Sequence, residues 1–151
     1  MLDKLDDAQW ADQLFDKAAD ACADPVGCAA AAGAVLTTRG DKERARRLYT
    51  KAETLCGGIG DYEILVRSAA QQTGDPGVVR EIVQSIESKF ASAHDLRTLA
   101  ECVLTYLSDE QWARRIYQKA LQASDANQRM SELIVSIKNS LGDETWARKL
   151  Y

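Results

Sequence analysis

The amino-acid sequence predicts an all-α protein built from antiparallel helix pairs with a 34-residue period. Three observations lead to this fold class. Five aspartates recur at this constant interval, as Asp7, Asp41, Asp75, Asp109 and Asp143. Apolar residues keep the same places after each aspartate, and the chain has only two prolines and few β-branched runs. A fixed period of this length is typical of helical repeats, in which each unit buries its apolar face against its neighbours.

The period divides the chain into repeated units within one domain, 1–151. The units are 7–40, 41–74, 75–108 and 109–142, with a partial unit 143–151. The likeness is plain between DEQWARRIY (109–117) and DETWARKLY (143–151), which agree at six of nine positions. We predict a right-handed α-solenoid, a stack in which each helix pair contacts only its neighbours.

Each unit is predicted to contain a helix that begins at its aspartate, followed by a return helix. The aspartate helices are expected at 7–22, 41–56, 75–90, 109–124 and 143–151. The return helices are expected at about 26–38, 60–72, 94–106 and 127–140. Each aspartate can accept hydrogen bonds from the unpaired N–H groups of a first turn, and its charge suits the positive end of the helix.

Glycines and prolines mark the ends of the same helices. Glycine precedes three of the aspartates, as Gly40, Gly74 and Gly142, where it can end a helix in the left-handed conformation. Pro25 and Pro76 each follow an aspartate, at the first helical position, where a missing N–H costs nothing.

The stretch SDEQWARRIYQKAL (108–121) resembles the second helix of a tetratricopeptide repeat (TPR). That family has an alanine, an aromatic residue and a second alanine, the pattern of Ala113, Tyr117 and Ala120. The same pattern occurs at Ala45, Tyr49 and Ala52 and at Ala11, Phe15 and Ala18. The first helix of the family usually carries a glycine, which only Gly33 matches; Arg67, Glu101 and Val135 stand at the corresponding positions. The chain is thus similar to a divergent TPR.

The resemblance implies a non-enzymatic scaffold that binds a peptide or protein through the concave face of the solenoid. The return helices would line this groove with Asp61, Ile64, Ser68, Gln71, Asp95, Thr98, Thr105, Arg129, Glu132, Ser136 and Asn139. The same register adds Gly27, Ala30, Ala34, Thr37 and Cys102. Such a surface is mostly uncharged, unlike TPR domains that clamp acidic C-termini with lysine, arginine and asparagine. We therefore expect an extended or helical peptide, held by shape and hydrogen bonds.

An alternative function depends on arginines that recur in the aspartate helices, at Arg46, Arg80, Arg114 and Arg148. Half-a-TPR repeats of RNA-processing factors also have an alanine–arginine–aromatic helix, similar to RARRLYTKAE (44–53). An RNA-associated module using this arginine ladder is therefore the second hypothesis. We favour ion pairs within each helix instead, such as Glu110 with Arg114, Glu144 with Arg148 and Glu43 with Arg47. Nucleic acid is not the expected partner, because the net charge is −4.

Other residues that suggest chemistry have simpler interpretations. Trp10, Trp112 and Trp146 share one place in the repeat, which favours packing over base or sugar stacking. His94 is the only histidine and has no evident catalytic partner. The GGIGD segment (57–61) lacks the lysine and spacing of a phosphate loop, so it is read as a turn. No catalytic residue, metal or cofactor is predicted.

The four cysteines are interpreted as separate small residues in a reducing compartment. Cys22 and Cys56 are repeat equivalents, so they should lie about 10 Å apart, beyond the reach of a disulfide. The acidic start MLDKLDDAQW does not resemble a signal peptide, and no apolar run approaches the roughly 18 residues of a membrane span. These features together predict a cytoplasmic protein.

The two ends of the repeat array lack a neighbouring helix. The first aspartate helix has only residues 1–5 before it, and the last ends at Tyr151. Since a solenoid end exposes its apolar face, we expect either a longer array or a homo-oligomer formed through these ends.

Overall fold

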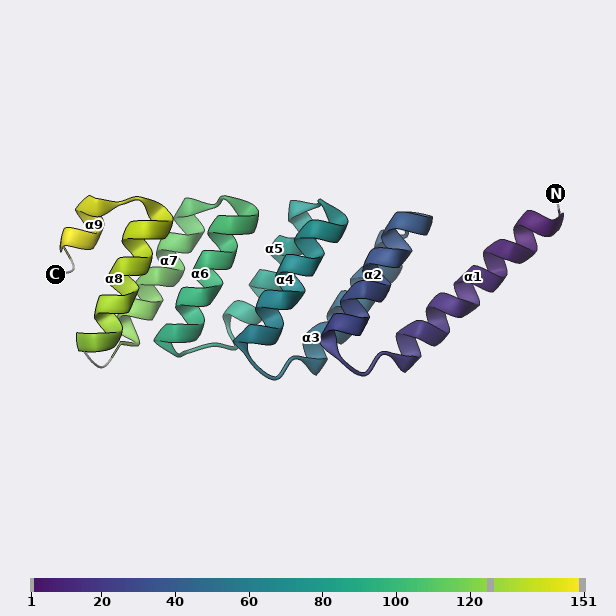
Figure 1. Cartoon of the computed structure of the whole chain (residues 1–151), viewed down its shortest axis with the longest axis horizontal. Helices are drawn as coiled ribbons and strands as arrows, with labels where there is room; N and C mark the ends of the chain where they lie inside the picture. The colour runs from purple at the N-terminus through teal and green to yellow at the C-terminus, as the bar shows by residue number, and fades with distance from the viewer. Residues whose placement is uncertain (1, 125–126, 150–151) are drawn as a thin grey trace. The chain divides into compact units, whose positions relative to one another are not determined.

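A computed structural model describes the backbone of residues 2–124 and 127–149, with the side chains of residues 7–124 and 131–149. The fold is all-helical, with 85% helix and no strand in the described part of the chain. Its helices pack against their neighbours (Figure 1). The chain forms two compact units, Met1–Gly74 and Asp75–Tyr151. The predicted all-α fold class is therefore confirmed.

The first unit contains four helices: α1 (Leu2–Ala21), α2 (Pro25–Arg39), α3 (Lys42–Leu55) and α4 (Ile59–Thr73). Helix α2 packs against α1, α3 and α4, and α3 also packs against α4. Its core is made of small and branched side chains from α2, α3 and α4, including Ala32, Val35, Leu48, Leu65 and Val66. Figure 1 shows α1 joined to α2 at one end and diverging from it toward the N-terminus.

The second unit contains α5 (Pro76–Glu87), α6 (Ala93–Leu107), α7 (Glu110–Gln122), α8 (Asn127–Leu141) and the short α9 (Glu144–Lys149). Helix α6 packs against α5, α7 and α8, while α8 also packs against α7 and α9. The core includes Val83, Leu99, Val103, Ile116 and Ile137, each at most 1% exposed. The return helices α6 and α8 therefore cover the apolar face of α7, as α2 and α4 cover that of α3.

The predicted capping pattern is confirmed from Asp41 onward. Asp41, Asp75, Asp109 and Asp143 each accept a hydrogen bond from a backbone N–H in the following first turn, at 2.8–3.0 Å. The glycines that precede three of them have left-handed backbones, with φ of 64° at Gly40, 59° at Gly74 and 65° at Gly142. Ser108 adopts the same conformation before Asp109, with φ of 52°.

The first helix differs from its predicted boundary. Asp7 was expected to cap a helix beginning there, but α1 begins at Leu2 and continues through Asp7. The preceding residues LDKLD contain good helix formers and no glycine or proline, so nothing stops the helix from starting earlier. The other described boundaries differ from the predicted ones by at most three residues, and residues 150 and 151 lie outside the described part of the chain.

The interpretation of the four cysteines as separate thiols is wrong. Cys22 and Cys28 form a disulfide across the turn between α1 and α2, with their Cα atoms 5.4 Å apart. Equivalent positions of neighbouring units are too far apart to pair, but the tight turn at residues 22–24 brings together two cysteines that are close in the sequence. The cysteines consequently no longer favour a reducing compartment.

Candidate partner-binding site

In the first unit, the predicted groove residues lie on α2 and α4, which pack against each other. Ala30, Ala34 and Thr37 are exposed on α2, and Gln71 is exposed on α4. Further predicted residues on α4 are half-buried, namely Asp61, Ile64 and Ser68. The exposed members of the predicted set in this unit are all uncharged.

Gly33 allows α2 and α4 to approach closely. This buried glycine faces the side chain of Gln72, and a Cβ built on it would lie 2.4 Å from Gln72 Oε1. The Gln72 oxygen in turn accepts a hydrogen bond from Tyr49 Oη on α3, at 3.2 Å. The lack of a side chain at Gly33 thus makes room for Gln72.

Asp61 has a local structural role. Its Oδ2 accepts a hydrogen bond from the backbone N–H of Gly57, at 2.8 Å, and so holds the turn between α3 and α4. The GGIGD segment is a turn followed by the first residues of α4, in agreement with its interpretation from the sequence.

In the second unit, the predicted groove residues on α6 and α8 fall into two groups. Thr105, Glu132 and Asn139 are exposed, whereas Asp95 and Thr98 are half-buried. The side chain of the predicted Arg129 lies outside the described residues. The exposed members of this set remain available to a partner.

Ser136 and Cys102 face the interior instead of lining an open groove. Ser136 is 7% exposed and Cys102 is 5% exposed. Ser136 Oγ lies 3.1 Å from Tyr117 Oη and donates a hydrogen bond to Glu101 Oε1, at 2.5 Å. A buried tyrosine hydroxyl needs a polar partner, so α8 turns Ser136 toward α7.

Tyr49 and Tyr117 form equivalent contacts in the two units. They stand two repeat periods apart in the sequence, and each hydroxyl contacts the return helix that follows its own helix. Burial raises the pKa of Tyr49 to about 12 and also raises the pKa of Tyr117. These polar contacts within the core were not predicted, because the sequence pattern marks both tyrosines only as apolar positions.

Two arginines of the ladder, Arg80 and Arg114, link successive aspartate helices of the second unit. Arg80 pairs with Asp109 at 3.1 Å, and its guanidinium carbon lies 5.2 Å from the centre of the Trp112 ring. Arg114 repeats this contact with Asp143, at 2.7 Å, and with the Trp146 ring, at 5.3 Å. Each arginine therefore combines an ion pair with a cation–π contact to the next aspartate helix.

These contacts add ion pairs between helices to those expected within each helix. The predicted pair between Glu144 and Arg148 is present at 3.3 Å, but Arg114 reaches the next helix. The Trp112 backbone N–H and then Arg80 hold the pKa of Asp109 below its ordinary value. Because Arg80 and Arg114 already have carboxylate partners, the ladder offers an RNA less free positive charge than the sequence suggested.

Trp112 confirms the predicted packing role of the tryptophans. It is 4% exposed, and its indole N–H donates to Glu87 Oε2 at 2.9 Å. Lys119 forms an ion pair with the same carboxylate. Burial opposes the charge on Glu87, but hydrogen bonds from Lys119 and Trp112 outweigh it and lower the pKa of Glu87. Trp10 is different: it is 64% exposed, so the packing prediction is wrong for this tryptophan.

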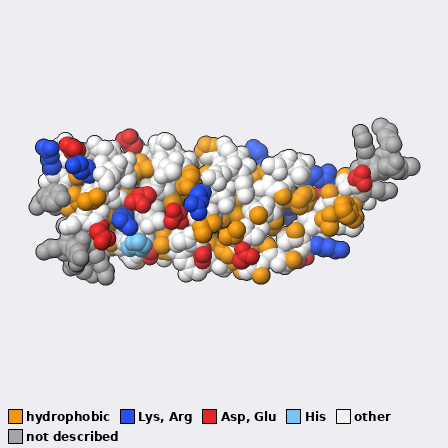
Figure 2. Space-filling view, viewed as in Figure 1, with side chains coloured by type: hydrophobic (Ala, Val, Ile, Leu, Met, Phe, Trp, Pro, Cys, Tyr) orange, Lys and Arg blue, Asp and Glu red, His pale blue; other side chains and the backbone are white. Residues whose placement is uncertain are grey.

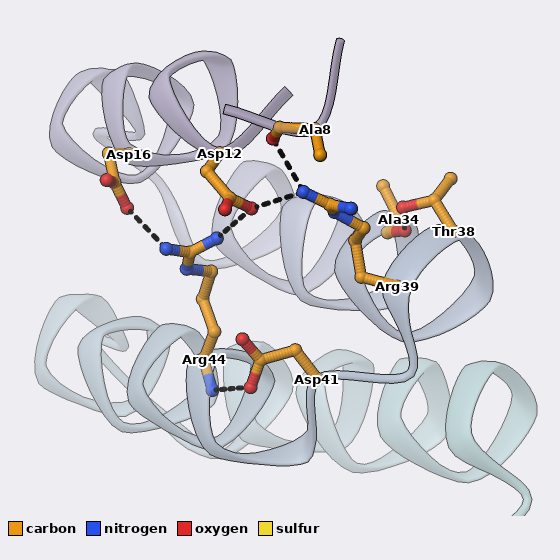
Figure 3. A network of polar contacts seen from close by, with 8 residues as sticks. All are labelled: Ala8, Asp12, Asp16, Ala34, Thr38, Arg39, Asp41 and Arg44. Atoms are coloured by element: carbon orange, nitrogen blue, oxygen red, sulfur yellow. Dashed lines mark hydrogen bonds and ion pairs between the residues drawn. The ribbon is translucent and has the colours of Figure 1, made fainter. Parts of the chain in front are cut away.

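Ion pairs join α1 to α2 and α3 (Figure 3). Asp12 accepts hydrogen bonds from Arg39 at 2.9 Å and from Arg44 at 2.8 Å. Arg39 also donates to the carbonyl of Ala8, at 2.6 Å, and Arg44 pairs with Asp16 at 3.5 Å. The hydrogen bonds from Arg39 and then Arg44 lower the pKa of Asp12.

In the contact between α1 and α3, the acidic and basic positions are exchanged relative to those of Arg80 and Arg114. Asp12 occupies the place in its aspartate helix that Arg80 holds in the helix beginning at Asp75. Arg44 follows Asp41 at the place where Trp112 follows Asp109. The acid thus lies on the earlier helix and the arginine on the later one.

The arrangement is one of packed helix pairs with exposed polar faces. No group of three or more potential ligand side chains for a metal is found among the described residues. None of the helices, so far as they are described, is both long and apolar enough to cross a bilayer. His94 is exposed, with its Nδ1 3.4 Å from Arg97 Nη2. No family model, curated protein or solved structure matches the chain.

Proposed function

We propose that the protein is a non-enzymatic interaction scaffold, a TPR-like right-handed solenoid that binds a peptide or protein partner through its return helices. The observation that carries this proposal is the pairing of return helices within each unit, α2 with α4 and α6 with α8. Each pair leaves short or amide side chains exposed, such as Ala34 and Gln71 in one unit and Asn139 in the other.

The polar contacts beneath these faces support the same function. Tyr49 is bonded to Gln72 in one unit, and Tyr117 to Ser136 in the other. Buried and satisfied polar contacts hold helices in one arrangement, and a preformed surface loses less conformational entropy when a partner binds. A partner in an extended or helical conformation would suit a surface of this kind.

The proposed function does not include a cytoplasmic location for the protein. Part of the support for a cytoplasmic protein came from interpreting all cysteines as thiols, and the bond between Cys22 and Cys28 removes that part.

The test is capture of partners from an extract of the source cells, followed by substitutions on the return helices. Gln71→Arg and Asn139→Arg each place a long cation on an exposed return-helix position. Gln118→Arg places the same side chain at an exposed position of α7 and serves as the matched control. We expect both return-helix variants to reduce capture of a specific partner and the control to retain it. Equal capture by all three variants would contradict binding through the return helices.

A further inference from the structure

Helix α1 packs less tightly than α3, α5 and α7, which each bury several apolar side chains. Among residues 7–21 of α1, whose side chains the structure describes, none is buried. Leu14 is 44% exposed, whereas Leu48, one repeat period later on α3, is 3% exposed. Trp10 is also exposed, and Figure 2 shows hydrophobic side chains on the surface at this end, beside the grey residues. Apolar burial therefore contributes less to the docking of α1 than to that of α3.

Cations of α2 and α3 contact the docked side of α1. Arg39 and Arg44 both donate to Asp12, as Figure 3 shows. Lys51 donates to the backbone carbonyl of Ala19 in the last turn of α1, where a cation suits the negative end of the helix. Water reaches these contacts, since the side chain of Asp12 is 44% exposed. Solvated ion pairs stabilise a fold only slightly, so they hold α1 weakly.

A covalent bond closes the turn between α1 and α2. Cys22 follows the last residue of α1, and its disulfide to Cys28 holds the two Cα atoms 5.4 Å apart. Cys28 is 0% exposed, so the bond fixes the end of α1 to the core of the unit. Tyr62 stands one repeat period after Cys28, and its hydroxyl donates to the carbonyl of Glu53 at 3.1 Å, which joins α4 to α3. The equivalent junctions thus differ, because a reductant can break only the first link.

We propose that the disulfide between Cys22 and Cys28 is a redox switch that controls the docking of α1. With the bond intact, α1 stays docked on α2 and α3. After reduction α1 detaches more often, by movement at the turn between α1 and α2, while the rest of the unit stays folded. Detachment removes a helix with six aspartates and two lysines, a net charge of −4. It uncovers the side of α2 and α3 that carries Arg39, Arg44 and Lys51, so an acidic surface becomes a basic one.

The reductant is a dithiol. One of its thiolates attacks the sulfur of Cys22, forms a mixed disulfide and releases Cys28 as a thiolate, which takes up a proton. The second thiol of the reductant then attacks the mixed disulfide, which releases Cys22 as a thiol and leaves the reductant as a disulfide. Two electrons and two protons thus pass from the dithiol to the two cysteines. Attack falls on Cys22 because this residue is half-buried, whereas Cys28 is 0% exposed.

The size of the effect follows from the loop that the disulfide closes. The bond restricts the detached state of α1 more than the docked state, in which the two cysteines already lie together. In the chain-entropy account, a loop closed over a sequence separation of 6 makes the open state about fiftyfold less populated. Part of this loop belongs to the first turn of α2, which stays folded, so we expect reduction to raise detachment by about tenfold to fiftyfold.

The test is hydrogen exchange of the full chain, followed by mass spectrometry, before and after reduction with dithiothreitol. We expect exchange of the α1 amides to become about tenfold to fiftyfold faster, with little change in α3 and α4. Cys22→Ser is the matched variant, because it removes the bond and leaves Cys28 as a thiol, as in the reduced chain. Its α1 should exchange as fast as that of the reduced parent. An effect of dithiothreitol on this variant would contradict the proposal, because it would come from other cysteines.

Amine labelling shows whether the basic side of α2 and α3 opens. The ammonium group of Lys51 is bonded to a carbonyl of α1, so an acetylating reagent should modify it faster once α1 is released. Lys119 of the second unit is the control, because its ion pair with Glu87 does not involve α1. Neither measurement involves the return-helix positions of the proposed function, so the two proposals can fail separately.

Three results would overturn the redox switch. The first is exchange of the α1 amides at the same rate in the oxidised and the reduced chain. The second is equal acceleration in α1, α3 and α4, because the disulfide would then stabilise the whole unit instead of the docking of α1. The third is faster exchange in α1 with unchanged labelling of Lys51, because the basic side would then stay covered.

Discussion

Replacement of Gly33 by alanine should destabilise the first unit, although this change ordinarily strengthens a helix. Gly33 lies inside α2, where alanine is favoured over glycine by about 1 kcal/mol. A Cβ at this position would lie 2.4 Å from Gln72 Oε1 and 2.5 Å from its Cδ. These distances are shorter than van der Waals contact, so Gln72 must move away.

Movement of Gln72 breaks its hydrogen bond with Tyr49, which lowers the free energy of unfolding. Its hydroxyl is bonded to Gln72 Oε1 at 3.2 Å, and the residue is only 2% exposed. A buried hydroxyl left without a partner costs about 1–3 kcal/mol. After the gain of about 1 kcal/mol from helix propensity, we expect Gly33→Ala to lower the free energy of unfolding by about 1 kcal/mol.

A double-mutant cycle measures the proposed cause. Tyr49→Phe removes the hydroxyl, so Gly33→Ala in that background should be close to neutral or stabilising, with a coupling of about 1–2 kcal/mol. Urea unfolding followed by far-UV circular dichroism gives the free energies. Gly60→Ala in α4 is the control, because nothing lies within 4 Å of its added Cβ and only the favourable helix term applies. Equal stabilisation by Gly33→Ala and Gly60→Ala would refute the reasoning, as would an unchanged cost in the Tyr49→Phe background.

Three further predictions concern α1, the disulfide and a buried tyrosine. The lowered pKa of Asp12 means that its ion pairs stabilise α1 at neutral pH and lose this effect as the pH falls through that pKa, below 3.8. Asp12→Asn should therefore speed hydrogen exchange of α1 amides near neutral pH, with no difference from the parent once Asp12 is protonated. Unfolding without reductant and alkylating with iodoacetamide should modify two of the four cysteines, with Cys22 and Cys28 protected; modification of all four would disprove the bond. Absorbance titration should show an ionisation near pH 12 that disappears in Tyr49→Phe, and the unfolding free energy should fall as the pH rises from the ordinary value of 10.0 toward about 12.

Local sequence signals predicted the helices well. A capping aspartate and a glycine with positive φ act within one turn of the chain, so Gly40 and Asp41 could be read without knowledge of the fold. The same signal failed at Asp7, where the residues before the aspartate allow the helix to continue. The capping pattern therefore predicts a helix start only where a helix-ending residue comes before it.

The contacts between helices could not be predicted in the same way. The period indicates that Arg80 and Arg114 share a position, but not that each reaches the aspartate that caps the next aspartate helix. The partner depends on how one helix is rotated against the next, which the repeat spacing leaves open. Ser136 shows the same difficulty within the groove. Its place in the repeat predicted an exposed residue, but Ser136 is buried and hydrogen-bonded to the hydroxyl of Tyr117.

The reversed ion pair between α1 and α3 has a consequence for rearranged versions of this protein. In the second unit an arginine of the earlier helix meets an aspartate and a tryptophan of the later one, as at Arg80 and Arg114. Between α1 and α3 the acid belongs to the earlier helix, at Asp12, and the arginine to the later, at Arg44. In a rearranged chain with α7 in the place of α3, Asp12 of α1 would lie near Asp109 and Trp112. Those two residues need a cation, and Asp12 is an acid. The helix pairs joined in this way are therefore not interchangeable modules, because the charges at these junctions differ.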